Sequence, residues 1–361
     1  LLPALAFFDV YPQRYSYVAD HFQYLSSLGP IAFVAAISSR ALAPWDERAR
    51  RINASRAAVL ALLLLLLCGL TWRQAKGYRS STVLWRTILV HNPHSYLAHN
   101  NLGLELAVQG RTADAILHYE MALKTKPDFA EARNNLGLAL FWSGRTDDAI
   151  VQYNIALRLR PDFADAKNNL GLALASKGRG AEALQLYKRA LMDRPDYALP
   201  YFNIGNMLAQ EGRLKEAIAN YKMALDAWPD YPDANNNLAN ALANSGDVQN
   251  AIIYYKRALR AKPVLPMAHS NLANVLAARG DLKGAIENYR EALKEAPDFA
   301  EAHNNLANAL LAEGNVDEAI EHYREAIRLK PGFGEAISNL SIAVSRKGLA
   351  AGKAGGMGAK K

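Results

Sequence analysis

Apolar and small residues recur along most of the chain with a period of 34 residues. A large aliphatic residue opens the pattern, and glycine or alanine follows it directly, at Leu102, Leu136, Leu170, Ile204, Leu238, Leu272 and Leu306. Later in each period come an alanine, a tyrosine and an alanine at spacings of four and three, as in Ala115, Tyr119 and Ala122. Such spacings place side chains on one stripe of a helix, and small residues let a second helix approach. Each period therefore predicts two packed helices.

Helix-breaking residues keep the same register. Proline recurs every 34 residues from Pro93 to Pro331, and glycine recurs with the same step from Gly110 to Gly348. The glycines from Gly110 to Gly314 each fall midway between two prolines, so the two breakers separate a pair of short helices. The pattern predicts seven repeats and then a capping helix at 334–348. The repeats span residues 96–129, 130–163, 164–197, 198–231, 232–265, 266–299 and 300–333.

Small residues facing small residues, with a tyrosine ring in the adjacent gap, resemble the packing of the tetratricopeptide repeat. The family pattern has tryptophan and tyrosine on the first helix, whereas here the first place varies, as in His99 and Arg133, and the second is leucine, as in Leu106. This variant is similar to the repeats of the nucleocytoplasmic O-linked N-acetylglucosamine transferase. The resemblance implies an all-α fold, in which the repeats form a right-handed superhelix, an α-solenoid, with a concave surface that binds protein or peptide.

The same register extends upstream of the first full repeat. Counting back 34 residues from Tyr119 gives Trp85, and counting back from Ala122 gives Ile88. We therefore expect residues 78–95 to form the second helix of a degenerate half-repeat, which caps the array.

An apolar run at 57–72 has no charged residue and is flanked by Arg56 and Arg73. At ~1.5 Å per residue it spans roughly 24 Å, less than a bilayer core of about 30 Å, but flanking arginines can snorkel and add reach. We expect transmembrane helices at about 56–73 and, from a weaker apolar segment, at about 22–39. The alternative for the stronger segment is a helix buried under the first repeat.

These two segments would form a transmembrane hairpin within residues 22–77, preceded by an aromatic juxtamembrane segment at 1–21. The loop between them is rich in arginine, and short basic loops favour the cytoplasmic side. The sequence thus predicts a membrane protein, anchored through residues 22–73, with its repeats on the non-cytoplasmic side. Basic residues after the second segment oppose this orientation, namely Arg73, Lys76 and Arg79.

The string VADHFQYLSSLG at 18–29 resembles the V-A-D-R-Y-x-Y-L-P-x-x-G segment of type C glycosyltransferase-like membrane proteins, which include tetratricopeptide repeat-containing O-mannosyltransferases. His21 stands where that family usually has arginine, and Ser26 where it has proline. The resemblance implies a second possible function, the acceptor-binding C-terminal part of a polytopic membrane glycosyltransferase. The family's catalytic carboxylates lie in early loops, so Asp9 and Asp20 are not catalytic candidates. Because the sequence begins at Leu1 and not at methionine, we expect it to be a fragment of a longer protein.

Charge and chemistry exclude several classes. The net charge is +8, but the basic excess lies at 1–95 and 346–361, and the array between them is slightly acidic, which argues against nucleic-acid binding. There is one cysteine, Cys68, and no phosphate-binding loop or HExxH motif. The histidines follow the repeat, as do His99 and His303, so we expect no metal site. The sequence predicts no cofactor and a monomeric array, and it contains no catalytic constellation.

Asparagine, a mediocre helix former, recurs in phase on the first helix of every repeat, which calls for a compensating role. We name this set the ladder: Asn101, Asn135, Asn169, Asn203, Asn237, Asn271, Asn305 and Asn339. In a tetratricopeptide superhelix this position faces the concave surface, where an amide can bind the main chain of an extended peptide. Two alternatives are duplication without function and hydrogen bonds within the solenoid.

The predicted groove is not uniform. Three residues after the ladder, the early repeats have Leu104, Leu138 and Leu172, and the later ones have a second column of asparagines: Asn206, Asn240, Asn274 and Asn308. We expect an apolar early half and a hydrogen-bonding later half. Phe141, Trp142 and Phe202 stand at positions that are small or polar in most repeats, so they are candidates for an anchor pocket, with ordinary packing as the alternative. The low-complexity composition of residues 349–361 predicts a disordered tail.

Overall fold

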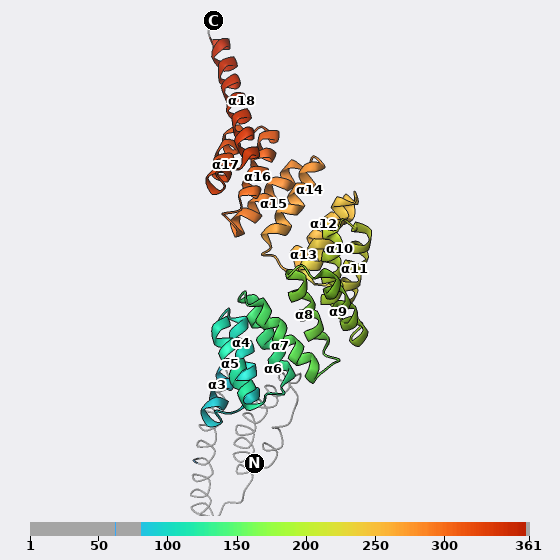
Figure 1. Ribbon diagram of the computed structural model, residues 1–361. Coiled ribbons are helices and arrows are strands. Elements are labelled where there is room, and N and C mark those ends of the chain that lie inside the picture. Colours follow the sequence, from blue (N-terminus) through green and yellow to red (C-terminus); the bar gives the residue numbers. More distant parts are fainter. Residues whose placement is uncertain (1–61, 63–80, 359–361) are drawn as a thin grey trace, which may run out of the picture. The chain divides into compact units, whose positions relative to one another are not determined.

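The computed structural model describes Leu62 and residues 81–358, and every regular element in this part of the chain is an α-helix (Figure 1). The helices are α3 (Ser81–His91), α4 (Tyr96–Val108), α5 (Thr112–Thr125), α6 (Ala130–Trp142), α7 (Thr146–Leu159), α8 (Ala164–Ser176), α9 (Gly180–Asp193), α10 (Ala198–Gln210), α11 (Leu214–Ala227), α12 (Pro232–Asn244), α13 (Val248–Ala261), α14 (Pro266–Ala278), α15 (Leu282–Glu295), α16 (Ala300–Glu313), α17 (Val316–Leu329) and α18 (Gly334–Gly358).

The chain divides into two compact units. The first ends at Leu159 and holds α3 to α7, and the second begins at Arg160 and holds α8 to α18. Within both units each 34-residue period contains one pair of antiparallel-packed neighbours, which we call helix A and helix B of a repeat. The prediction of an all-α array with two helices per repeat is confirmed.

A tyrosine from helix B fills the gap beside the small residue of helix A. Tyr153 is fully buried, and a Cβ atom built on Gly137 would lie only 2.6 Å from Cε1 of that ring. The alanines on either side of the tyrosine, such as Ala149 and Ala156, are also fully buried. The core of each repeat is therefore a stripe of small residues closed by one aromatic ring.

The turn between helices A and B needs a left-handed residue. The glycines at this place have a positive φ, between 75° at Gly110 and 99° at Gly314, which costs glycine little because it has no Cβ atom. Gly348 is different, because α18 continues past it to Gly358. The predicted tail at 349–361 therefore begins within a helix.

Upstream, α3 lies within the residues where the half-repeat is expected, with Trp85 buried and Ile88 half-buried. Both apolar segments expected to span a membrane, 22–39 and 56–73, lie outside the described residues, apart from Leu62, and so does the glycosyltransferase-like string at 18–29. Among the helices that the structure describes, none combines the length and the apolar character needed to cross a bilayer.

Candidate functional site

The ladder asparagines are half-buried, and most of them donate a hydrogen bond to an asparagine of the preceding repeat. The Nδ2–Oδ1 distances are 3.0 Å for Asn135 to Asn100, 2.9 Å for Asn203 to Asn168, 2.9 Å for Asn237 to Asn206, 3.1 Å for Asn271 to Asn240, 3.0 Å for Asn305 to Asn274 and 2.9 Å for Asn339 to Asn308. The ladder therefore ties neighbouring helices A together, as the alternative of bonds within the solenoid requires.

Two different acceptors serve the ladder. In the early repeats the acceptor is the residue just before the ladder position, as in Asn100 and Asn168. In the later repeats it is the second asparagine column, three residues after the ladder, as in Asn206 and Asn240. Asn339 donates to both kinds, to Asn308 at 2.9 Å and to Asn304 at 3.4 Å.

The early repeats have leucine in the second asparagine column, and Phe202 replaces the first kind of acceptor, so each of these side chains removes one of the two acceptors. Asn271 has both kinds in the preceding repeat, Asn236 and Asn240, and it bonds to Asn240.

The second asparagines also accept a bond from the tyrosine of their own repeat. The Oη–Oδ1 distances are 2.9 Å for Tyr221 to Asn206, 2.6 Å for Tyr255 to Asn240, 2.5 Å for Tyr289 to Asn274 and 2.6 Å for Tyr323 to Asn308. Burial raises the pKa of Tyr221, Tyr255 and Tyr323 to about 12, so these phenols keep their proton at neutral pH and act as donors. Sequence reasoning missed these bonds, although an asparagine 15 residues before each tyrosine signals them.

Neighbouring amides show the direction of the ladder bonds at two positions of the network. Asn236 donates from Nδ2 to Oδ1 of Asn237 at 3.1 Å, and Asn304 does the same to Asn305, so these ladder oxygens are acceptors. Their Nδ2 groups therefore point to the second column. There each Oδ1 atom accepts one bond from tyrosine and one from the ladder, and its Nδ2 group is left for another partner.

A pocket of about 320 Å³ lies on the later repeats, between α14, α15 and α16. Asn274, Asn305 and Asn308 line it together with Tyr289, and the remaining lining is apolar and comes from Ala277, Leu282, Ala309 and Ala312. The structure thus brings ladder and second-column amides together around one hollow that has no charged lining residue.

The aromatic candidates for an anchor pocket have separate surroundings. Phe141 contacts its neighbour Trp142 edge-on, with ring centroids 5.4 Å apart, and Trp142 is 71% exposed. Phe202 lies in the second unit, against Tyr221 and Tyr231, with ring centroids 6.0 and 5.0 Å away. Packing thus accounts for Phe202, whereas Trp142 remains available on the surface.

Two histidine pairs join helices A and B, in the first and the seventh repeat. His99 and His118 approach to 2.9 Å between their Nδ1 atoms, and His303 and His322 do the same. Nε2 of His99 and of His303 contacts a proline carbonyl at 3.0 and 3.1 Å, and since a carbonyl only accepts, Nε2 carries the proton and Nδ1 accepts from the partner ring. Burial, and then the partner histidine, lowers the pKa of His118 and of His322. Nowhere in the described part do three potential metal ligands gather.

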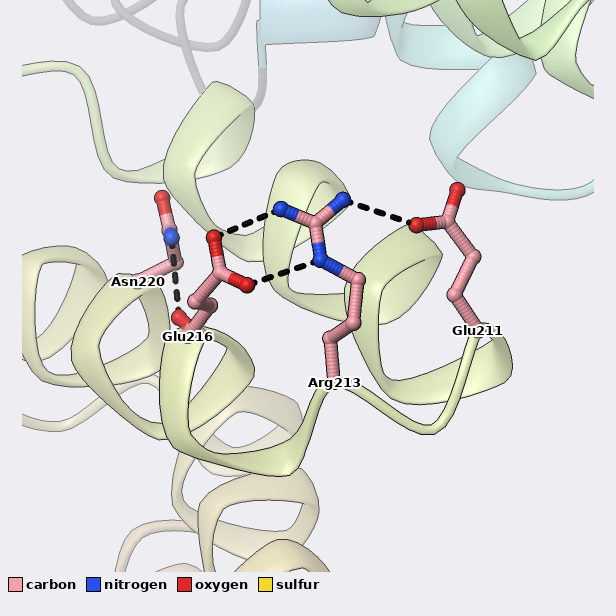
Figure 2. A network of polar contacts seen from close by, with 4 residues as sticks. All are labelled: Glu211, Arg213, Glu216 and Asn220. Carbon is pink, nitrogen blue, oxygen red and sulfur yellow. Dashed lines mark hydrogen bonds and ion pairs between the residues drawn. The ribbon is translucent and has the colours of Figure 1, made fainter.

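The turn between α10 and α11 carries an exposed polar network (Figure 2). Arg213 donates from Nε and Nη2 to the carboxylate of Glu216 at 2.7 and 2.6 Å, and from Nη1 to Glu211 at 3.0 Å, while Asn220 donates to the Glu216 carbonyl at 2.9 Å. The same arginine-to-acid pairing three residues apart occurs at Arg111, Arg145 and Arg179. Exposed pairs of this kind contribute little stability, so the network marks the turn rather than a binding site.

Comparison with solved structures supports the fold. One chain of the APC/C hetero-tetramer Cut9–Hcn1 aligns with a TM-score of 0.61 at 20% identity over 73% of this protein. This protein spans about half, 52%, of the length of that relative. PilF of Pseudomonas aeruginosa aligns with a TM-score of 0.54 at 22% identity, over 58% of this chain and 95% of its own. PilW, a type IV pilus biogenesis factor, gives 0.52 at 23% identity, over 58% and 98%. No curated protein matches the chain.

A family model for the tetratricopeptide repeat matches residues 83–128, 100–154, 134–198, 201–266 and 270–332, which together exceed half of the 361 residues. None of the comparisons tests the resemblance to the O-linked N-acetylglucosamine transferase repeats or to the membrane glycosyltransferases, so both stay predictions. The repeat register, the paired helices and this match agree, and the chain belongs to the tetratricopeptide repeat family.

Proposed function

We propose that the protein is a membrane-anchored scaffold that binds extended polypeptide along the asparagine-lined face of its repeats. Repeats of this family are typical of protein–protein interaction. The observation that carries the proposal is the pocket on α14, α15 and α16, where Asn274, Asn305 and Asn308 meet beside an apolar floor. Amides on apolar surroundings suit a main chain that offers a polar group at every residue.

The hydrogen bonds within the ladder are compatible with this function. A ladder amide has two N–H groups, and the bond to the preceding repeat uses one of them. The second N–H group remains, and the bond to the neighbouring amide holds it in a fixed position. Such preorganisation lowers the entropy that a ligand must lose on binding.

Binding is tested with the full-length chain and an unselected library of extended peptides. Changing Asn203, Asn237 and Asn271 together to alanine should weaken every selected peptide, because main-chain bonds carry little side-chain information and each costs about 0.5–1.5 kcal/mol. The control changes Lys222, Lys256 and Lys283 to alanine, three exposed residues on helix B of the same repeats. Equal binding by both triple variants would contradict the proposal.

The membrane anchor rests on the two apolar segments at 22–39 and 56–73 and on the arginine-rich loop between them. It predicts that position 50 and the exposed position 196 lie on opposite sides of a membrane. Single cysteines replacing Arg50 or Asp196, in a chain with Cys68→Ser, should label from opposite sides in sealed vesicles. Labelling of both from the same side rules out the hairpin.

A further inference from the structure

We propose that the second asparagine column, Asn206, Asn240, Asn274 and Asn308, binds the main-chain carbonyl oxygens of a polypeptide in the polyproline II conformation. This proposal rests on the proposed function and adds the chemical class of the ligand to it. Three features of the later repeats carry it: the polarity of the amides, the spacing of the repeats and the lining of the pocket.

The polarity follows from a count of hydrogen-bonding groups. An amide oxygen has two lone pairs, and the Oδ1 atom of Asn240 already accepts from Tyr255 at 2.6 Å and from Asn271 at 3.1 Å. Both lone pairs are therefore used, and the same holds for the other members of the column. What each residue offers a ligand is an Nδ2 group with two N–H donors, so the column can bind acceptors only.

A surface that offers only donors suits a ligand that presents carbonyl oxygens and has no N–H groups to satisfy. Proline is the residue that has a main-chain carbonyl and no N–H, so a proline-rich segment loses nothing at such a surface. A segment that needs its N–H groups satisfied gains less there, because the column cannot accept a bond. The second column thus favours proline-rich sequence over ordinary extended sequence.

The spacing agrees with this conformation. A polyproline II helix has three residues per turn and rises about 3.1 Å per residue, so equivalent carbonyls recur about every 9 Å. Packed helices lie roughly 8–10 Å apart, and the ladder bonds show that successive helices A are direct neighbours. One carbonyl of every third residue can therefore meet one member of the column.

The lining of the pocket suits pyrrolidine rings. Leu282 and the alanines Ala277, Ala309 and Ala312 provide an apolar surface next to Asn274 and Asn308, and Tyr289 adds an aromatic edge. Proline rings dock on apolar and aromatic surfaces, while their carbonyls stay free for donors. No charged residue lines this pocket, so a neutral ligand fits it.

The test uses the full-length chain and a fluorescein-labelled nonaproline amide as the probe, with a labelled nine-residue Gly-Ser peptide for comparison. The variant is Asn240→Asp, Asn274→Asp and Asn308→Asp. Aspartate keeps an oxygen for the tyrosine and the ladder amide, but it replaces the free N–H donors by a second oxygen. We expect the nonaproline to bind more tightly than the Gly-Ser peptide, and the triple variant to bind it at least tenfold more weakly.

The control adds the same charge at exposed places on helix B: Gln185→Glu, Ala219→Glu and Gln249→Glu. It should bind nonaproline like the unchanged chain. If the triple aspartate variant does not fold, Asn274→Asp at the exposed member of the column replaces it, with an expected loss of about threefold.

Unchanged nonaproline affinity in a folded aspartate variant overturns the inference. Tight binding of library peptides without binding of nonaproline overturns it as well, but leaves the proposed function standing. Absence of binding to every peptide removes both.

Discussion

The first three repeats and the last three, residues 96–197 and 232–333, share one register, and three of their consistent differences concern the contacts of helices A and B. The small residue of helix A is glycine in the early repeats, as at Gly103, and alanine in the late ones, as at Ala239. The next residue changes from leucine to asparagine. The residue before helix B changes from arginine to aspartate or asparagine. The first change alters packing against the tyrosine ring, and the other two alter how a polar group finds a partner.

The central difference concerns the buried tyrosine. In the late repeats the phenol of Tyr255 donates to Asn240, which in turn holds the ladder amide of the next repeat. In the second repeat, Oη of Tyr153 is buried and has no hydrogen-bond partner, since Leu138 stands in the asparagine column. A buried hydroxyl without a partner costs about 1–3 kcal/mol, so the tyrosine of the second repeat relies on packing alone where the tyrosines of the late repeats join a polar network.

The start of helix B shows a smaller difference. Arg111 pairs with Asp114 on the surface, whereas Asp281 of a late repeat accepts a bond from the backbone N–H of Gly284 at 3.0 Å. Exposed ion pairs contribute about 0–1 kcal/mol, and an N-cap side chain typically contributes about 1 kcal/mol. The fourth repeat combines the two types, because it keeps Gly205 and Arg213 but already has Asn206.

The largest expected effect comes from giving an early repeat the small residue of a late one. In Gly137→Ala the new Cβ atom would meet Cε1 of Tyr153 at 2.6 Å. Overpacking should cost about 1–3 kcal/mol, more than the gain of up to ~1 kcal/mol in helix propensity. Urea unfolding of the full chain measures the change. If Gly137→Ala is more stable than the unchanged chain, the comparison is wrong. Ala239→Gly makes the reverse exchange in a late repeat.

The asparagine of the late repeats can be transplanted into an early one. In Leu138→Asn the new amide takes the place, 15 residues before Tyr153, that Asn240 has before Tyr255. A double-mutant cycle of Leu138→Asn with Tyr153→Phe should give a favourable coupling of about 0.5–1.5 kcal/mol, because the buried hydroxyl gains an acceptor. A coupling near zero would show that the neighbouring side chain does not decide the bonding of the phenol.

Acid should act on both regions, because a histidine pair occurs in the first repeat and in the seventh. The pKa of His118 and of His322 is lowered from the ordinary histidine value of 6.5 in the folded chain. Below pH 6.5 the unfolded chain therefore binds more protons than the folded chain. Stability should be complete above about pH 6.5 and fall as the pH drops through the lowered values. Charged groups that modulate these shifts are Asp114, Arg86 and Arg111 for His118, and Glu318, Arg290 and Glu321 for His322.

The second repeat supplies a control for this pH dependence. There Arg133 donates to Gln152 at 2.9 Å and to the carbonyl of Pro127, in the place of a histidine pair. The double variant His99→Arg, His118→Gln copies this pair and should flatten the decrease of melting temperature between pH 7 and pH 5. If the melting temperature of the double variant falls as much as before, other groups cause the pH dependence. The pair of His303 and His322 would then be changed next.

The repeat boundaries and the paired helices could be predicted from the sequence, because they depend on spacings within one period. The tyrosine at 119 and the alanines at 115 and 122 mark a helical stripe whatever the rest of the chain does. The helical extension of α18 past Gly348 could not be predicted, since Gly348 stands in phase with the glycines that follow helix A in the other repeats.

The partners of the ladder were beyond sequence reasoning for a different reason. A ladder amide has two candidate acceptors in the preceding repeat, and a leucine or a phenylalanine at one place removes one of them. Where both places hold asparagine, as for Asn271 and Asn339, only the structure shows which bonds form. The sequence left three interpretations of the ladder, and the structure shows bonds within the solenoid, while peptide binding stays a proposal. The repeat register aligns His99 with His303 in different repeats. It does not show that each lies beside a histidine of its own repeat, His118 or His322.

The most direct test of the difference between the two regions removes one hydroxyl from each. Tyr255→Phe breaks the bond to Asn240, so it should lower the free energy of unfolding by about 0.5–1.5 kcal/mol. Tyr153→Phe removes a buried hydroxyl that has no partner, so stability should stay the same or rise. Both variants lose the same atom from fully packed rings, and urea unfolding compares them directly. Equal losses in the two variants would contradict the account.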